Sequence, residues 1–346
     1  MTSMKIILGT FYLVSILTRP GFSTLFPNDD DNNSLQKILL RDSAQDIHVA
    51  RNLMTTNIDH FHVFGSGKIK IIMPSDSSYV KTFFNWLIFF LRHCPKTSLI
   101  EDLYFICLDE KNHEQLSSKG ITCSRSESNL IVRDKEKMEA GTPLDFSELW
   151  RLRVNISDDL LRSGYDVLLA DSDVIWIKNP FPVFNQYDDS DIISTRGIFT
   201  THISTALGAT LCMGFMYIKS NLGTIELWTK MKQIMDDEKR KNKFSDDQIV
   251  LNKVLVHEGL QYDVKRLKYP FGKDVNFGTI VSKTTNETIL KIALLPHISF
   301  QRICVDETDV EYSVLNATIA HCNSPKDSKN KRSTHKRMRI WELNDE

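Results

Sequence analysis

The sequence lacks the features that would point to several common classes of protein. Its 346 residues include only 10 Pro and 14 Gly, too few for a collagen-like or linker-rich chain. The 43 Lys and Arg residues are balanced by 44 Asp and Glu residues, so there is no basic excess with which to bind nucleic acid. No internal repeat and no CxxC pair occurs, which removes support for a zinc ribbon. What remains is an ordinary globular composition, with 41% hydrophobic and 25% charged residues.

The first apolar run, Ile6–Leu17, is too short to span a bilayer, which takes about 20 apolar residues. Its length is typical of the hydrophobic region of a signal peptide, and Gly21 and Ser23 offer small residues for cleavage. The run predicts a signal peptide over residues 1–23, with a retained signal anchor as the alternative. Either interpretation predicts entry into the secretory pathway, and contact with a membrane only if the run is retained.

Two further features agree with a secretory destination. Asn-x-Ser/Thr tripeptides, the acceptor pattern for N-glycosylation, begin at four positions: Asn32, Asn155, Asn286 and Asn316. Six cysteines allow up to three disulfides in an oxidising lumen, although free buried thiols are the alternative for several of them.

Residues 24–67 begin with a polar, acidic stretch and predict a stem that ends near Gly65-Ser66-Gly67. From Lys68 onward, short apolar runs alternate with helical patterns. The predicted strands and helices are, in order, Ile69–Met73, helix Val80–Arg92, Leu103–Leu108, helix Ser147–Ser163 and Val167–Ala170. This alternation predicts one α/β domain over residues 68–346, with a Rossmann-like, mainly parallel sheet flanked by helices.

Ligands of such sheets bind at the carboxyl ends of the strands. Ser75 and Asp76 follow the first strand, and Asp171 and Asp173 follow the third. Asp171 and Asp173 point the same way because side chains alternate along an extended chain. Two adjacent carboxylates repel unless a cation lies between them, and a divalent ion would also hold the oxygens of a diphosphate. The pair therefore predicts a metal site, with a solvated turn as the alternative.

This acidic segment resembles the DxD region of the nucleotide-diphospho-sugar transferases. It reads Asp-Ser-Asp-Val-Ile-Trp from Asp171 and is more narrowly similar to the family-77 glycosyltransferases of GT-A fold. Other motifs follow in the order of that family: Asn85-Trp86, Trp150–Arg153, Cys212–Tyr217, Asp247-Gln248 with Asn252, and Ile319–Asn323. The resemblance spans roughly residues 68–341 and implies a single GT-A catalytic domain.

The resemblance also implies the substrates and the cofactor. The donor would be a UDP-sugar of the xylose, galactose or arabinose class, transferred with retention to a hydroxyl of a glycan or glycoprotein. Asp171 and Asp173 would bind ribose and Mn²⁺ (or Mg²⁺), and His321 would be the third metal ligand, since imidazole tolerates manganese. An ordinary half-buried histidine is the alternative for His321. The expected location is the Golgi lumen, with secretion or the Golgi membrane as alternatives.

A departing diphosphate requires positive charge beside it. Arg153 lies one helix before the acidic pair, and Lys326 and Lys329 lie in a basic run after His321. These three are the candidate cations. Pairing with an acid of its own helix, Asp145 or Glu148, is the alternative for Arg153.

Asp247 and Gln248 begin a predicted helix and, by the resemblance, contact the donor sugar. Asp246 before them is either the helix N-cap or a second contact. Gly214 lacks a side chain and would let the backbone approach the sugar closely.

Two functions of other classes fit part of this pattern. A hydrophobic strand followed by Asp-x-Asp also occurs in haloacid-dehalogenase-type phosphatases, where the first Asp, here Asp171, is a nucleophile. That nucleophile lies near the start of its domain, whereas here more than a hundred residues of the domain precede it. The second alternative is a secreted protein that binds nucleotide sugars without turning them over; the intact set of candidate residues argues against it.

Overall fold

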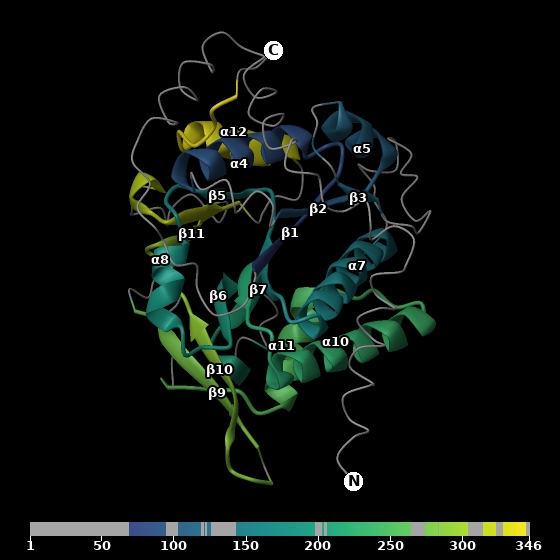
Figure 1. Ribbon diagram of the computed structural model, residues 1–346, viewed down its shortest axis with the longest axis vertical. Coiled ribbons are helices and arrows are strands. Elements are labelled where there is room, and N and C mark those ends of the chain that lie inside the picture. The colour runs from purple at the N-terminus through teal and green to yellow at the C-terminus, as the bar shows by residue number, and fades with distance from the viewer. Residues whose placement is uncertain are drawn as a thin grey trace, which may run out of the picture.

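Figure 1 shows the computed structural model of the chain, in which a large sheet is covered by helices. The structure describes residues 69–94, 103–118, 121, 123–125, 143–197, 203, 206–263, 274–282, 284–303, 314–322 and 328–343. The predicted signal peptide and stem lie outside these residues, as does Lys326. Among the helices of the described ranges, none has both the length and the apolar character needed to cross a membrane.

The main sheet has nine strands in the order β3-β2-β1-β4-β7-β6-β10-β9-β8. Its first four strands are parallel to one another. They are β1 (Ile69–Ser75), β2 (Leu103–Cys107), β3 (Ser124–Arg125) and β4 (Asp166–Ala170). Because they are parallel, their carboxyl ends meet at one edge, where Asp76 and Asp171 both lie.

The second half of the sheet is mixed. Strand β7 is antiparallel to both β4 and β6, whereas β10 is parallel to β6. The strands of this half are β6 (Ile192–Gly197), β7 (Thr210–Ile218), β8 (Gln261–Tyr262), β9 (Asn276–Val281) and β10 (Thr288–Leu294). A separate small sheet has the order β11-β12-β5. It consists of β11 (Phe300–Arg302), β12 (Ile319–His321) and β5 (Val174–Trp176).

Helices cover both faces of the main sheet (Figure 1). One face carries α4 (Val80–His93), α12 (Ser328–Arg337) and the small sheet, and the other carries α7 (Pro143–Arg162), α10 (Leu222–Arg240) and α11 (Asp247–His257). Side chains of β4 alternate between the two cores: Leu168 belongs to the first and Leu169 to the second. The predicted α/β class, with a sheet buried on both faces, is therefore confirmed.

The predicted elements agree with the structure to within a few residues. The largest difference is in α7, which begins at Pro143 rather than Ser147. Proline suits the first turn of a helix, where its missing N–H would have no partner in any case. The predicted stop at Gly164 is confirmed, because this residue adopts φ +83, which favours glycine.

Disulfides are present, as the cysteine count suggested. Cys107 at the end of β2 is bonded to Cys123, and Cys322 is also in a disulfide. Cys94 and Cys212 are free and buried, so the alternative of free thiols holds for these two.

One buried amide ties the segment after α12 to α4. Asn85 is fully buried; its Nδ2 donates to the carbonyl of Ile340 at 2.9 Å, and its Oδ1 accepts from the N–H of Glu342 at 2.7 Å. The neighbouring Trp86 packs edge-on against Trp176 of β5, with ring centres 5.7 Å apart. These contacts hold α12 over the carboxyl edge of the sheet.

Replacement of Asn85 by alanine is expected to lower the free energy of unfolding by about 1–3 kcal/mol, because two buried backbone groups lose their partners. Urea unfolding of the full chain measures this loss. Arg92→Ala is the matched control: it removes the partly exposed ion pair with Glu342 and should cost only about 0–1 kcal/mol. Equal losses in both variants would contradict the role given to Asn85.

Candidate active site

The site forms where the chain passes from the main sheet to the small one. Asp171, Ser172 and Asp173 connect β4 to β5, and the N–H of Asp171 donates to the carbonyl of Gly214 in β7 at 2.8 Å. Strand β12 pairs antiparallel with β5, and the register sets His321 opposite Val174. A histidine about 150 residues further along the chain is thereby delivered beside Asp173.

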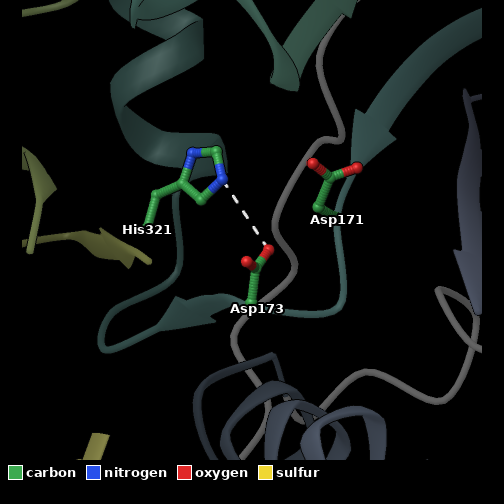
Figure 2. Close-up of side chains that lie close together, drawn as sticks. All are labelled: Asp171, Asp173 and His321. Carbon is green, nitrogen blue, oxygen red and sulfur yellow. Dashed lines mark ion pairs between the residues drawn. The ribbon is translucent and has the colours of Figure 1, made fainter. Parts of the chain in front are cut away.

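Asp171, Asp173 and His321 form a compact group (Figure 2). One potential ligand atom from each lies within 4.8 Å of the other two, and Asp173 Oδ1 is 3.7 Å from His321 Nε2. Asp173 and His321 are buried, whereas the Asp171 carboxyl is partly exposed. Burial lowers the pKa of His321 to about 3, so its ring is uncharged at neutral pH and offers a lone pair.

This group fits a divalent cation. Carboxylate oxygens with one imidazole nitrogen are suitable ligands for Mn²⁺ and acceptable for Mg²⁺. Gly214 keeps the space open: a Cβ there would lie 2.4 Å from His321 Cε1 and 2.7 Å from Asp171 Oδ2. The Cys212 sulfur lies 3.8 Å from His321 Nδ1, the side of the ring turned away from Asp173. Gly214 was predicted to admit the sugar, and the structure adds a second reason for glycine there.

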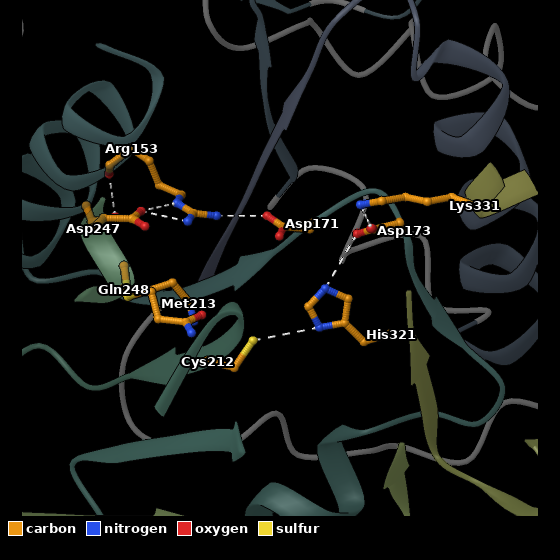
Figure 3. Close-up of polar contacts among 10 residues, drawn as sticks. Arg153, Asp171, Asp173, Cys212, Met213, Asp247, Gln248, His321 and Lys331 are labelled. Carbon is orange, nitrogen blue, oxygen red and sulfur yellow. Dashed lines mark hydrogen bonds and ion pairs between the residues drawn. The ribbon is translucent and has the colours of Figure 1, made fainter. Parts of the chain in front are cut away.

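Arg153 of α7 joins two of the predicted acidic residues (Figure 3). Its Nε and NH2 contact Asp247 Oδ2 at 2.7 and 2.6 Å, and its NH1 contacts Asp171 Oδ1 at 2.8 Å. Burial alone would lower the pKa of Arg153, but the two carboxylates raise it overall. The alternative partner Glu148 is wrong, because Glu148 pairs with Arg151, and the Asp145 side chain lies outside the described residues.

The first residues of α11 have divided roles. Asp246 is the helix N-cap, since its Oδ1 accepts from the N–H of Ile249 at 2.9 Å. Asp247 is 1% exposed, and burial raises the pKa of its carboxyl to about 7 in spite of Arg153. Gln248 lines the cavity described below, and its Nε2 is buried without a hydrogen-bond partner among the described residues.

Strand β7 is irregular where it passes the site, and α11 supplies the missing hydrogen bonds. The register of β7 against β6 shifts between Met216 and Leu211. Gln248 Oε1 accepts from the N–H of Met213 at 3.1 Å, and the Asn252 amide bonds both the N–H and the carbonyl of Leu211, at 2.8 and 2.9 Å. The motif residue Asn252 thus has a structural function.

Most of the predicted site residues line one cavity. It is lined by Ser75, Asp76, Arg153, Asp171, Asp173, Gly214, Asp247, Gln248 and His321, together with Tyr79 and Lys331. Asp76 is oriented by its own turn, because its Oδ1 accepts from the N–H and the hydroxyl of Ser78 at 2.8 and 2.6 Å. Lys326 and the side chain of Lys329 lie outside the described residues.

Lys331 is the site residue that sequence reasoning missed. Its ammonium pairs with Asp173 Oδ2 and lies 5.3 Å from the centre of the Tyr79 ring. Burial would lower the pKa of Lys331, but Asp173 raises it overall. Lys331 and His335 are both buried and lie one turn apart in α12, yet the helix is polar all round, so no apolar periodicity marks its inner face.

Comparison with known proteins gives a family assignment. The sequence model of a family described as nucleotide-diphospho-sugar transferase matches residues 98–334, which is about two thirds of the chain. The match includes the acidic pair, Arg153, Asp247 and His321.

Individual relatives are more distant. An arabinosyltransferase of Arabidopsis thaliana, XEG113, is 25% identical over 175 residues, covering 49% of this chain and 26% of the relative. A UDP-galactose:fucoside alpha-3-galactosyltransferase of Dictyostelium discoideum is 26% identical over 204 residues, covering 51% and 30%. The chain thus spans less than a third of the length of these two relatives. Among solved structures, mouse xyloside xylosyltransferase 1 aligns with a TM-score of 0.43 and 12% identity, covering 75% of this chain and 99% of that one.

Gly214→Ala is expected to reduce the affinity for Mn²⁺ by about tenfold or more, because a Cβ would displace His321 and Asp171. Electron paramagnetic resonance of free Mn²⁺ measures this affinity. Gly164→Ala is the control: its Cβ would meet open space but its φ is +83, so it should cost about 1–2 kcal/mol of stability and leave Mn²⁺ binding unchanged. Unaltered Mn²⁺ affinity in Gly214→Ala would count against the cation site.

Proposed function

The chain belongs to the nucleotide-diphospho-sugar transferase family, and we propose that it transfers a sugar from a UDP-sugar to a hydroxyl of a glycan or glycoprotein, with a divalent cation. The observation that carries this proposal is the convergence of Asp171, Asp173 and His321, whose ligand atoms lie within 4.8 Å of one another at the carboxyl edge of the sheet. Topology alone brings these residues together from two distant parts of the chain. The alternative, a solvated turn, does not explain why a buried histidine lies beside the two carboxylates.

Asp171, Asp173 and His321 would hold the cation, with Mn²⁺ as our first choice and Mg²⁺ as the second. When bound, such a cation neutralises charge on the leaving diphosphate. Arg153 sets the spacing of the acidic residues, because its guanidinium is divided between Asp171 and Asp247. Its contribution is to hold the two carboxylates at a fixed separation, rather than to receive the diphosphate directly.

Gln248 and Asp247 are our candidates for contact with the donor sugar. Buried polar atoms are nearly always hydrogen-bonded, and Gln248 lines the cavity while its buried Nε2 has no partner among the described residues, so a small shift of this side chain would let it donate to an acceptor on the donor. A sugar hydroxyl would be such an acceptor. Asp247, oriented by Arg153, would accept from a neighbouring hydroxyl, and Ser75 and Asp76 line the part of the cavity after β1.

The wider context of the reaction is also a proposal. We infer retention of configuration and a donor of the xylose, galactose or arabinose class; the relatives are named as an arabinosyltransferase and a galactosyltransferase. We further infer a signal peptide or anchor (residues 1–23), a stem (24–67) and one catalytic domain (68–346) in the Golgi lumen. The Cys107–Cys123 disulfide supports an oxidising compartment.

A screen of UDP-sugars with Mn²⁺, with released UDP and glycosylated acceptor as readouts, tests the proposed reaction on the full chain. Loss of a residue that only supports a metal ligand typically costs about 10–100-fold, so Asp173→Ala, which removes a ligand itself, should lower turnover by more than about 100-fold. Asp189→Asn, at an exposed carboxylate paired with Lys291, should leave turnover unchanged.

Two results would instead favour the other classes of protein. Release of phosphate from a simple ester, dependent on Asp171, would support a phosphatase. Tight Mn²⁺-dependent UDP binding without turnover of any UDP-sugar would support a binding protein.

Turnover is expected to rise with pH through about 7, because burial raises the pKa of Asp247 to that value and only the ionised carboxylate pairs with Arg153. Below this pH the protonated Asp247 carboxyl attracts Arg153 only weakly. Arg153 then no longer holds the Asp171 carboxylate in a fixed position. In Asp247→Asn the rise near neutral pH should disappear from the pH profile of turnover at saturating donor. A profile that keeps the same midpoint in this variant would assign the titration to another group.

A further inference from the structure

Both aspartates of the proposed metal site already carry a buried cation (Figure 3). Arg153 donates to Asp171 Oδ1, and the ammonium of Lys331 donates to Asp173 Oδ2. Lys331 is only 8% exposed, which is rare for lysine unless its charge is paired. Each carboxylate therefore already has a cationic partner within the chain, although Asp171 shares Arg153 with Asp247.

The two cations differ in how firmly they are held. Arg153 makes contacts to two carboxylates with three of its nitrogens, so its planar group is fixed. Lys331 has one carboxylate partner among the described residues, Asp173, and its ammonium is a point charge on a flexible four-carbon stem. Lys331 is thus the cation that can leave without breaking a second ion pair.

A divalent ion and the Lys331 ammonium would compete for one carboxylate. Asp173 Oδ2 accepts from Lys331 while Asp173 Oδ1 faces His321 Nε2 at 3.7 Å. A metal ion bound by Asp173 and His321 would therefore lie close to a like charge, in a buried site where screening is weak. Binding of the ion alone is disfavoured while Lys331 remains in place.

A diphosphate would remove this conflict. Lys331, Tyr79 and Asp173 line the same cavity, so phosphate oxygens bound beside the metal would offer the ammonium a new partner within reach of its stem. The charge of Lys331 would then stabilise the ligand instead of opposing the metal.

We propose that Lys331 is a resident counter-ion, which neutralises Asp173 in the metal-free site and passes to the diphosphate of the nucleotide when metal and nucleotide bind. This inference rests on the proposed function, because a nucleotide diphosphate is the second partner of Lys331. It makes Lys331 a positioning residue that couples two ligands: the nucleotide raises the affinity for metal, and the metal raises the affinity for nucleotide by the same factor.

The test compares Mn²⁺ affinity of the full chain, measured by electron paramagnetic resonance, with and without UDP. Lys331→Gln removes the charge and should bind Mn²⁺ alone at least about fivefold more tightly than the unaltered chain. UDP should then improve Mn²⁺ binding by a smaller factor in this variant. Lys331→Arg keeps the charge, and Lys336→Gln changes an exposed lysine of the same helix, so both should behave like the unaltered chain.

A Lys331→Gln protein that melts cooperatively and binds Mn²⁺ alone no more tightly than the unaltered chain would overturn the proposal, since Lys331 would then merely anchor α12. Thermal melting gives a second readout: Mn²⁺ should raise the melting temperature of Lys331→Gln more than that of the unaltered chain, because only the variant leaves Asp173 unpaired without metal.

If Lys331→Gln does not fold, the unaltered chain and a second variant decide. No increase in Mn²⁺ affinity on addition of UDP overturns the proposal. Because the diphosphate also ligates Mn²⁺ directly, support comes from Lys331→Met, which keeps an unbranched stem without the charge and should bind Mn²⁺ alone more tightly than the unaltered chain. Absence of UDP binding even at saturating Mn²⁺ would contradict the proposed function, whereas UDP binding without this coupling would contradict only the role of Lys331.

Discussion

Mutual repulsion among buried carboxylates is the constraint around which this site is built. Asp173 and Asp247 are almost inaccessible to water, and Asp171 lies between them at the cavity wall. Charges in such a place must be paired, and two helices supply the cations: Arg153 of α7 is shared by Asp171 and Asp247, and Lys331 of α12 pairs with Asp173. The positions of both helices over the sheet edge follow from this need as much as from apolar packing.

The change of sheet at Asp171–Asp173 makes the arrangement possible. A strand that continued in the main sheet would direct these side chains into the apolar cores on its two faces, whereas β5 leaves to pair with β12. Behind the turn, Trp176 is surrounded by rings of Trp86, Phe90 and Phe215, whose centres lie 5.3 to 5.9 Å away. This aromatic cluster anchors β5, the strand that directly follows the two carboxylates.

Sequence reasoning succeeded where the signal was local. The apolar run before Asp171 predicted β4, and the spacing of Asp171 and Asp173 predicted that their side chains point the same way, which agrees with their closeness in the structure. The bond from Arg153 to Asp247 spans 94 positions, and no pattern in either helix indicated that pairing. Disulfide connectivity was equally hidden, since cysteine spacing does not determine it. Lys331 was missed for a different reason: its helix is polar on every side, and the buried partner Asp173 cannot be read from the pattern of the helix itself.

The tie from Asn85 to the backbone at Ile340 and Glu342 also has a consequence for biosynthesis. Sheet strands β1 to β4 and the acidic pair emerge from the ribosome well before β12 and α12 are made. The acidic pair is therefore made before the residues that lie beside it in the folded domain, His321 of β12 and Lys331 of α12. A chain truncated before β12 would lack both His321 and Lys331, so it would lose the whole arrangement around the acidic pair rather than part of it.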